Sequence, residues 1–109
     1  MEDLTKKKCI PCEVGSMDPM DRKLAESYMS MAEGWVLAPD TKSISKDYKF
    51  KDFVESMQFV NKVADVAESE GHHPDIHIFY NKVHIDLTTH AINGLSENDF
   101  IVAAKINKI

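Results

Sequence analysis

The sequence predicts an α+β domain, in which a single four-stranded antiparallel sheet is covered by three helices packed on one side, in the order αββαββα. Three observations predict this class. Apolar residues recur at helical spacing in the segments 18–34, 51–70 and 96–109. The segments 35–50 and 76–87 alternate apolar and polar residues around turn-forming sequences, as β-hairpins do. Because the strands come in adjacent pairs, antiparallel pairing is favoured over a parallel sheet.

Length and charge limit the classes of protein. The 109 residues are enough for one domain, which we divide into an irregular lead-in over residues 1–17 and a folded domain over 18–109. The net charge of −5 excludes non-specific nucleic-acid binding. No apolar stretch is long enough to cross a membrane, and the polar N-terminus lacks the hydrophobic segment of a signal peptide. We therefore expect a cytoplasmic protein with no nucleic-acid and no membrane partner.

The first helix is predicted to begin at Asp18 as N-cap, with Pro19 at the first helical position, and to end at Gly34. A first hairpin follows, with strands over 35–38 and 43–50 joined by the turn-like sequence Pro-Asp-Thr-Lys. The helix is expected to pack into the core through Met20, Leu24, Tyr28 and Met31.

The longest helix is predicted over residues 51–70. Three apolar residues, Phe59, Val63 and Val66, widen its apolar arc beyond that of a typical surface helix. The excess apolar surface needs a partner, which indicates self-association. The central stripe is predicted to consist of Phe53, Met57, Val60, Ala64 and Ala67.

All five histidines fall in or beside the second hairpin, whose strands, 76–80 and 83–87, flank the turn pair Asn81-Lys82. Extending this register outward places His73 opposite His90. The other opposed pairs are predicted to be Tyr80 and Val83, Ile78 and Ile85, Ile76 and Leu87, Phe79 and His84, and His77 and Asp86.

His72 is expected at a helix C-terminus. Gly71 is a good helix-terminating residue, and Pro74 prevents the helix from resuming. The helix dipole and the carboxylates of Glu68 and Glu70 favour an imidazolium at that point. Since histidine exchanges a proton near neutral pH, His72 fits a general acid.

The last helix is predicted to begin at Ser96 as N-cap after a turn at Gly94-Leu95. Asp99 stands three residues on, so it fits the acidic member of a capping box. A capping carboxylate can also orient a neighbouring histidine, and we keep both interpretations.

Cys9 and Cys12 form a single C-I-P-C in the lead-in. One such pair supplies half of a tetrahedral zinc site, and no second pair exists. Because the pair does not follow a strand and open a helix, an incidental or structural role is favoured over redox or metal chemistry.

These residues carry a resemblance to a known family. The sequence resembles the pterin-4a-carbinolamine dehydratases, and its lead-in is similar to that of microbial members. The matching motifs are Gly34-Trp35, F-K-D-F at 50–53, E-x-x-x-H-H-P at 68–74, Y-N-K-V-H-I at 80–85, T-H at 89–90 and G-L-S-E-N-D at 94–99. One departure is Ile76, His77 and Ile78, where aromatic residues are common in the family.

The resemblance implies dehydration of 4a-hydroxytetrahydrobiopterin, a pterin-4a-carbinolamine, to quinonoid dihydropterin and water during tetrahydrobiopterin recycling. It implies no metal and no organic cofactor, a small-molecule pterin substrate, and a homodimer or homotetramer. It also implies site residues. His72 and His90 are assigned as the general acid and the general base, in either order, and His73 is assigned to orienting the pterin. Glu68 and Asp99 are the supporting acidic residues. The substrate-binding residues are Trp35, His73, Pro74, Thr88 and Thr89. His77 and His84 are expected to be exposed sheet residues or partner contacts.

Three alternatives remain open. Animal members of the family also serve as dimerisation cofactors of a homeodomain transcription factor, which would make this chain a protein-binding module. The pterin pocket could instead act on a molybdopterin-related metabolite. The third alternative is metal binding by His72, His73 and His90, which the adjacency of the first two disfavours.

Overall fold

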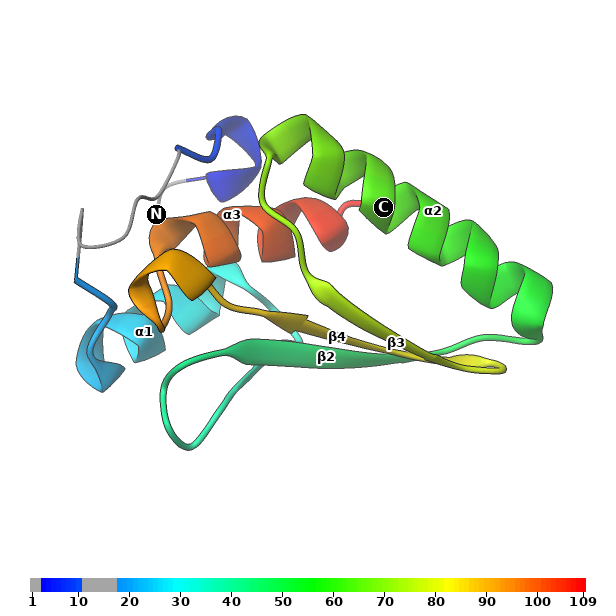
Figure 1. The fold of residues 1–109 in the computed structure, drawn as a ribbon, viewed down its shortest axis with the longest axis horizontal. Helices are drawn as coiled ribbons and strands as arrows, with labels where there is room; N and C mark the ends of the chain where they lie inside the picture. Colours follow the sequence, from blue (N-terminus) through cyan, green and yellow to red (C-terminus); the bar gives the residue numbers. More distant parts are fainter. Residues whose placement is uncertain (1–2, 11–17) are drawn as a thin grey trace.

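The computed structural model describes residues 3–10 and 18–109 (Figure 1). It confirms the predicted α+β class and the order αββαββα. Short 3₁₀ turns accompany these elements: η1 (Leu4–Lys6), η2 (Met29–Met31) and η3 (His90–Ile92). The helices are α1 (Arg22–Tyr28), α2 (Phe53–Glu70) and α3 (Glu97–Ile106), and the strands are β1 (Val36–Leu37), β2 (Ile44–Lys49), β3 (Asp75–Phe79) and β4 (Lys82–Leu87).

The four strands form one sheet in the order β1-β2-β4-β3, and every neighbouring pair is antiparallel. α2 and α3 lie on one side of this sheet (Figure 1). α3 is the centre of the core: every residue from Asn98 to Ala104 is buried, and the helix contacts α2, η1 and η2. Ile44, Ile85 and Leu87 pack beneath it from the sheet.

The first helix begins later than predicted. Its N-cap is Asp21, whose carboxylate accepts a hydrogen bond from the Leu24 N–H at 2.8 Å, and not Asp18. The Met20 N–H donates instead to the Leu95 carbonyl at 2.9 Å. This bond holds the chain before Asp21 against the loop that precedes α3. The prediction therefore failed because a tertiary hydrogen bond outweighs the local Asp-Pro signal.

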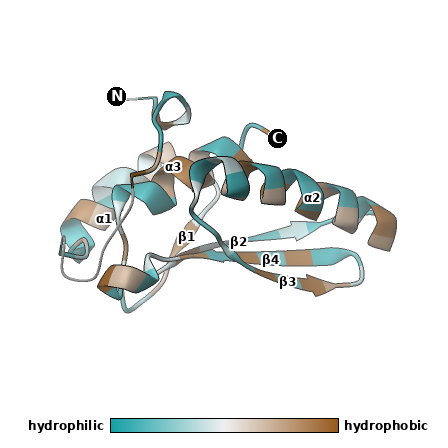
Figure 2. Ribbon diagram, turned by 45° about the horizontal axis from the view of Figure 1, so that its top comes forward, coloured by the Kyte–Doolittle hydropathy of each residue, from teal (hydrophilic) through white to brown (hydrophobic). Residues whose placement is uncertain are grey.

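The burial of α2 matches its predicted central stripe only in part: Ala67 is buried and Val60 packs, partly buried, against the core. Ser56, Val63 and Ala67 are buried, whereas Phe53 is 49% exposed and Ala64 is also exposed. Apolar residues cover so wide an arc that periodicity could not decide which edge faces the sheet. Figure 2 shows hydrophobic residues remaining at the outer, N-terminal end of α2.

The second hairpin turns at Tyr80-Asn81 and not at Asn81-Lys82. Phe79 pairs with Lys82, so every predicted partner in the ladder is displaced by two residues. The direct neighbours are therefore His77 and His84, Asp75 and Asp86, Ile76 and Ile85, and Ile78 and Val83. A displacement of two keeps each side chain on its predicted face. The error arises because Tyr80 takes the positive φ of 53°, which is rare for an aromatic residue.

Candidate active site

A cavity of about 370 Å³ lies where the C-terminal end of α2, the chain after β4 and the beginning of α3 meet. Its lining comes from residues 9–10, 70–73 and 88–91, together with Asn98. The volume falls in the range of small-ligand sites. The structure thus brings His72, His73 and His90 to one cavity.

Local sequence explains why His72 reaches this cavity. Gly71 ends α2 in the left-handed conformation, with φ of 65°, and its N–H donates to the Ala67 carbonyl. The next N–H, of His72, donates to the same carbonyl at 3.2 Å. The chain is thereby turned off the helix axis before Pro74, and the imidazole is directed toward α3.

The His72 ring is held by a buried carboxylate. Its Nε2 lies 2.6 Å from Oδ1 of Asp99, and the two side chains are 13% and 0% exposed. A carboxylate accepts hydrogen bonds, so the Nε2–H is the donor and Nδ1 is the ring nitrogen left for proton exchange.

Asp99 is fixed by two further donors. Its Oδ2 accepts from the Thr89 hydroxyl at 2.8 Å and from the Ser96 N–H at 3.0 Å. The second bond completes the capping box at the start of α3. Since Thr89 donates to Asp99, the Ser96 hydroxyl donates to Thr89, at 2.7 Å. Both interpretations of Asp99 therefore hold: it caps α3 and it orients His72.

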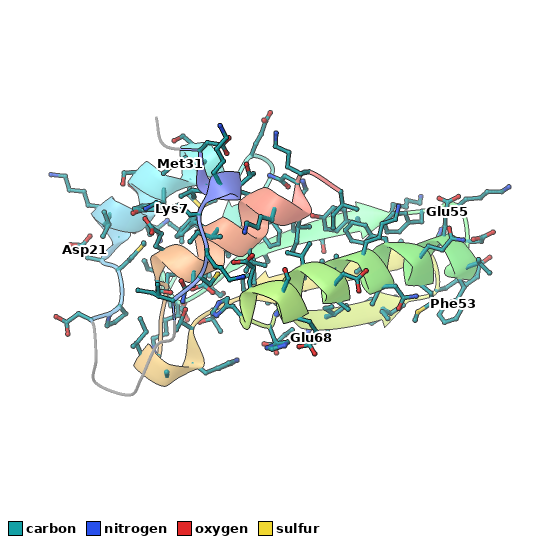
Figure 3. All side chains as sticks on the ribbon, turned by 90° about the horizontal axis from the view of Figure 1, so that it is seen from above. Lys7, Asp21, Met31, Phe53, Glu55 and Glu68 are labelled. Atoms are coloured by element: carbon teal, nitrogen blue, oxygen red, sulfur yellow. The ribbon has the colours of Figure 1, made fainter. Side chains whose placement is uncertain are left out.

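The other two histidines lie at the open side of the cavity. His73 is 60% exposed and pairs through Nε2 with Glu68, which projects from the last turns of α2 (Figure 3). His90 is 75% exposed, with its Nε2 at 3.9 Å from Oδ2 of Asp75. The predicted opposition of His73 and His90 is wrong. The ladder ends at Asp75 and Asp86, and His90 opens the separate turn η3.

The remaining substrate-binding candidates fall into two groups. Thr88 and Thr89 line the cavity, whereas Pro74 is not part of its lining. Trp35 lies in the core, 5% exposed, and donates from Nε1 to Asn107 at 3.1 Å. Within this chain the structure does not bring Trp35 to the cavity.

Sequence reasoning missed one wall of the cavity. Cys9, Ile10 and Asn98 contribute to the lining, but no spacing in the sequence indicates that the lead-in reaches α3. Glu70 also lines the cavity, and its carboxylate accepts from the Cys9 N–H at 2.9 Å and from Lys105 at 2.6 Å. Burial opposes ionisation of this carboxyl, but the Lys105 ammonium and the Cys9 N–H together lower its pKa.

Cys9 itself is held as a thiol. Burial, with the Glu70 carboxylate beside it, raises the pKa of Cys9 to about 12. Its Sγ lies 3.6 Å from the Asn98 carbonyl. A thiol in this state is a poor nucleophile and a poor metal ligand. Cys12, the other half of the motif, lies outside the described residues.

His77 and His84 lie on the sheet face that the helices leave open. Their rings are 5.8 Å apart, and His84 bonds Asp47 through Nδ1 at 2.5 Å and Asp86 through Nε2 at 3.1 Å. The bond to Asp47, assisted by Asp86, raises the pKa of His84 despite partial burial. Neither histidine lines the candidate site, and both lie on the sheet as predicted.

Within residues 3–10 and 18–109, no group of three or more histidine, cysteine, aspartate or glutamate side chains is arranged to hold a metal ion. None of the helices in those ranges has the length and hydrophobicity needed to span a membrane.

Fold and site together define a small α+β protein with a histidine-carboxylate pair at a ligand-sized cavity. The model of the pterin 4 alpha carbinolamine dehydratase family matches residues 18–109. The chain therefore belongs to this family of hydro-lyases.

Relatives support the assignment over the whole chain. "Pterin-4-alpha-carbinolamine dehydratase 2, mitochondrial" of Arabidopsis thaliana is 45% identical over 112 residues; the match takes in 100% of this chain, which spans only 60% of the plant protein. A protein of Halorhodospira halophila, named provisionally as a pterin-4-alpha-carbinolamine dehydratase, is 44% identical over 97% of this chain and 96% of its own length.

Solved structures agree. A transcriptional coactivator/pterin dehydratase from Brucella melitensis is 31% identical, with a TM-score of 0.77 over 84% of this chain and 97% of the other. A pterin dehydratase-like protein described as a RuBisCO assembly factor in the alpha-carboxysome has a TM-score of 0.59 over 72% of this chain and 90% of the other. At 20% identity, the second likeness concerns the fold alone.

Proposed function

We propose that this protein dehydrates 4a-hydroxytetrahydrobiopterin to quinonoid dihydropterin and water. The observation that carries the proposal is the buried pair of His72 and Asp99 at a cavity that also contains His73 and His90. The names of the relatives point to the same reaction. Tetrahydrobiopterin recycling is the role that this reaction would serve.

The chemistry requires two proton transfers and no change of oxidation state. A proton is delivered to the 4a-hydroxyl, the C4a–O bond breaks, and water leaves. A proton is removed from the neighbouring ring nitrogen, whose electron pair forms the new C=N bond. Two positioned groups that exchange protons near neutral pH meet these requirements.

We assign the two transfers to His72 and His90. The Asp99 carboxylate supports His72 because it accepts a hydrogen bond from Nε2 and so holds the ring in one tautomer and one orientation. His90 is 75% exposed, so it can exchange its proton with solvent between turnovers. The order of the two roles stays open. His73, paired with Glu68, orients the pterin, and Thr88 and Thr89 contribute to its binding.

The test is dehydratase activity on enzymatically generated 4a-hydroxytetrahydrobiopterin, corrected for the spontaneous reaction. His72→Ala and His90→Ala are each expected to lower kcat by roughly two to four orders of magnitude. His77→Ala is the matched control, since it removes an exposed histidine from the open face of the sheet and should change kcat little. If His77→Ala lost as much activity as His72→Ala, the assignment of the two proton transfers to His72 and His90 would be contradicted.

A homodimer or homotetramer is part of the proposal. The exposed apolar residues of α2, with Phe53 at 49% and Val54 at 63%, support self-association through this helix. Light scattering on the purified protein gives the oligomeric mass, and a monomer at micromolar concentration would contradict the assignment of this surface.

A cytoplasmic location stays a prediction.

One observation favours a second function, that of a protein-binding coactivator. The similar structure from Brucella melitensis is described as a transcriptional coactivator as well as a pterin dehydratase. A folded wild-type protein without dehydratase activity would favour this function, or action on a molybdopterin-related metabolite, over the one proposed. Pull-down with a purified transcription factor and direct binding of that metabolite would separate the two.

A further inference from the structure

The lead-in segment Lys7–Ile10 forms a wall of the candidate active site, yet it lies outside the part of the chain that the family model matches. That match begins at Asp18. Cys9 and Ile10 nevertheless line the same cavity as the three histidines. The segment runs beside the C-terminal end of α2 and the beginning of α3 (Figure 1). Cys9 and Ile10, the two described residues of the C-I-P-C motif, therefore lie at the site.

Asn98 holds the segment by two hydrogen bonds to the backbone of Ile10, one to its N–H and one to its carbonyl. Its Oδ1 accepts from the Ile10 N–H at 3.1 Å, and its Nδ2 donates to the Ile10 carbonyl at 2.6 Å. Asn98 is 4% exposed, so this amide is fixed by packing in the first turn of α3. Two bonds to a single backbone position define both the place and the orientation of Ile10.

Three more contacts attach the segment upstream of Ile10. The Cys9 N–H donates to the Glu70 carboxylate at 2.9 Å, and Lys7 pairs with Glu97 at 3.0 Å. Lys8 donates to the Ser69 carbonyl at 3.2 Å. The segment is therefore bound to the end of α2 as well as to α3, which are the two elements that position His72 and Asp99.

The surface that Cys9 and Ile10 present to the cavity is apolar. The Ile10 side chain is 61% exposed although it is attached to a firmly held backbone, and Cys9 presents an uncharged thiol. The rest of the lining is rich in polar groups, from His72, His73 and Thr89. A flat heteroaromatic ring has polar edges and apolar faces, and it would bury the exposed Ile10 on binding.

We propose that Ile10 is a specificity-determining residue that packs on the bound pterin, and that Asn98 is the positioning residue that places it there. This inference rests on the proposed dehydratase function. Neither residue takes part in proton transfer, so their removal should weaken binding and leave the chemical step intact.

The experiment compares Ile10→Ala with Val36→Ala in the full chain. Val36 is a control of the same type, since it is a β-branched aliphatic residue that is 63% exposed on β1 and does not line the cavity. The readouts are KM and kcat on 4a-hydroxytetrahydrobiopterin and the Kd for 7,8-dihydrobiopterin, a pterin with no hydroxyl to lose.

Ile10→Ala should raise KM and Kd about tenfold with kcat within about twofold of wild type, the scale of losing the burial of about two of the three carbon atoms that the substitution removes. Val36→Ala should change none of the three. Asn98→Ala should raise KM at least as much as Ile10→Ala does. The double variant Ile10→Ala/Asn98→Ala should have the same KM as Asn98→Ala alone, because a released segment no longer places Ile10 at the cavity.

The outcomes separate this inference from the proposed function. If wild type turns over the carbinolamine and Ile10→Ala matches Val36→Ala, the role of Ile10 is refuted while the dehydratase stands. A fall in kcat at unchanged KM would also refute it. If wild type neither turns over the substrate nor binds 7,8-dihydrobiopterin, the proposed function itself fails.

Discussion

Replacing Asp99 by Asn tests the histidine-carboxylate pair with almost no change of shape. The Asp99 Oδ2 accepts from Thr89 and from the Ser96 N–H, at 2.8 and 3.0 Å. An Asn side chain would keep its single oxygen at these two donors and turn its NH₂ toward His72. The His72 Nε2 then faces a donor and must become an acceptor, which moves the ring proton to Nδ1.

Two consequences follow from this switch of tautomer. The imidazolium, which carries a proton on both nitrogens, would be opposed by the Asn NH₂, so the proton-exchanging form of His72 is lost. We expect kcat to fall by roughly two to four orders of magnitude, the range for losing a positioned acid or base. Stability should fall by only about 1 kcal/mol, because the new side chain still accepts the capping bond from Ser96.

The assay pairs turnover with urea unfolding. Asp86→Asn is the matched control, as it makes the same chemical change on the open face of the sheet beside His84. It should leave kcat within about twofold of wild type. A folded Asp99→Asn protein with kcat within threefold of wild type would show that the carboxylate has no part in proton transfer.

Three further predictions concern stability. The hydrogen bond to Asp47 raises the pKa of His84 in the folded protein. The pair therefore stabilises the fold at a pH below the ordinary range of histidine, and this contribution is lost as pH rises through the raised value. Asp47→Asn should remove about 0.5 kcal/mol of unfolding free energy at pH 5 and nothing at pH 9, measured by urea unfolding. Lys105→Met leaves the buried Glu70 carboxylate without its ammonium partner, and should cost about 2 kcal/mol at pH 7. Since the pKa of Glu70 is lowered in the fold, that cost should shrink as pH falls and the carboxyl is protonated, and a constant cost would contradict the ion-pair explanation. Gly71→Ala meets no atom within 4 Å but keeps the positive φ, so it should cost about 1 kcal/mol through backbone strain alone, and a smaller change in thermal unfolding would show that α2 can end otherwise.

The features that sequence predicted correctly are those that local chemistry decides. Gly71 ends α2 because glycine adopts positive φ readily, and Ser96 with Asp99 forms a capping box three residues apart. Both were visible from a few neighbouring residues. The position of His72 follows from the first and that of its carboxylate partner from the second.

The features that sequence missed depend on contacts between distant segments. The N-cap of α1 is Asp21 and not Asp18, because the Met20 N–H is hydrogen-bonded to the Leu95 carbonyl. The hairpin register differs because Tyr80 adopts a conformation that its own side chain disfavours. No periodicity in the lead-in could reveal that Ile10 meets Asn98 across the cavity wall.

The most direct measurement is the rate at which purified wild-type protein removes 4a-hydroxytetrahydrobiopterin, followed by stopped-flow absorbance against the spontaneous rate and against His72→Ala. Catalysis by wild type that falls toward the spontaneous rate in His72→Ala is the predicted result. A folded wild type that leaves the spontaneous rate unchanged would contradict the dehydratase function, and full activity in His72→Ala would contradict its assignment to the His72-Asp99 pair.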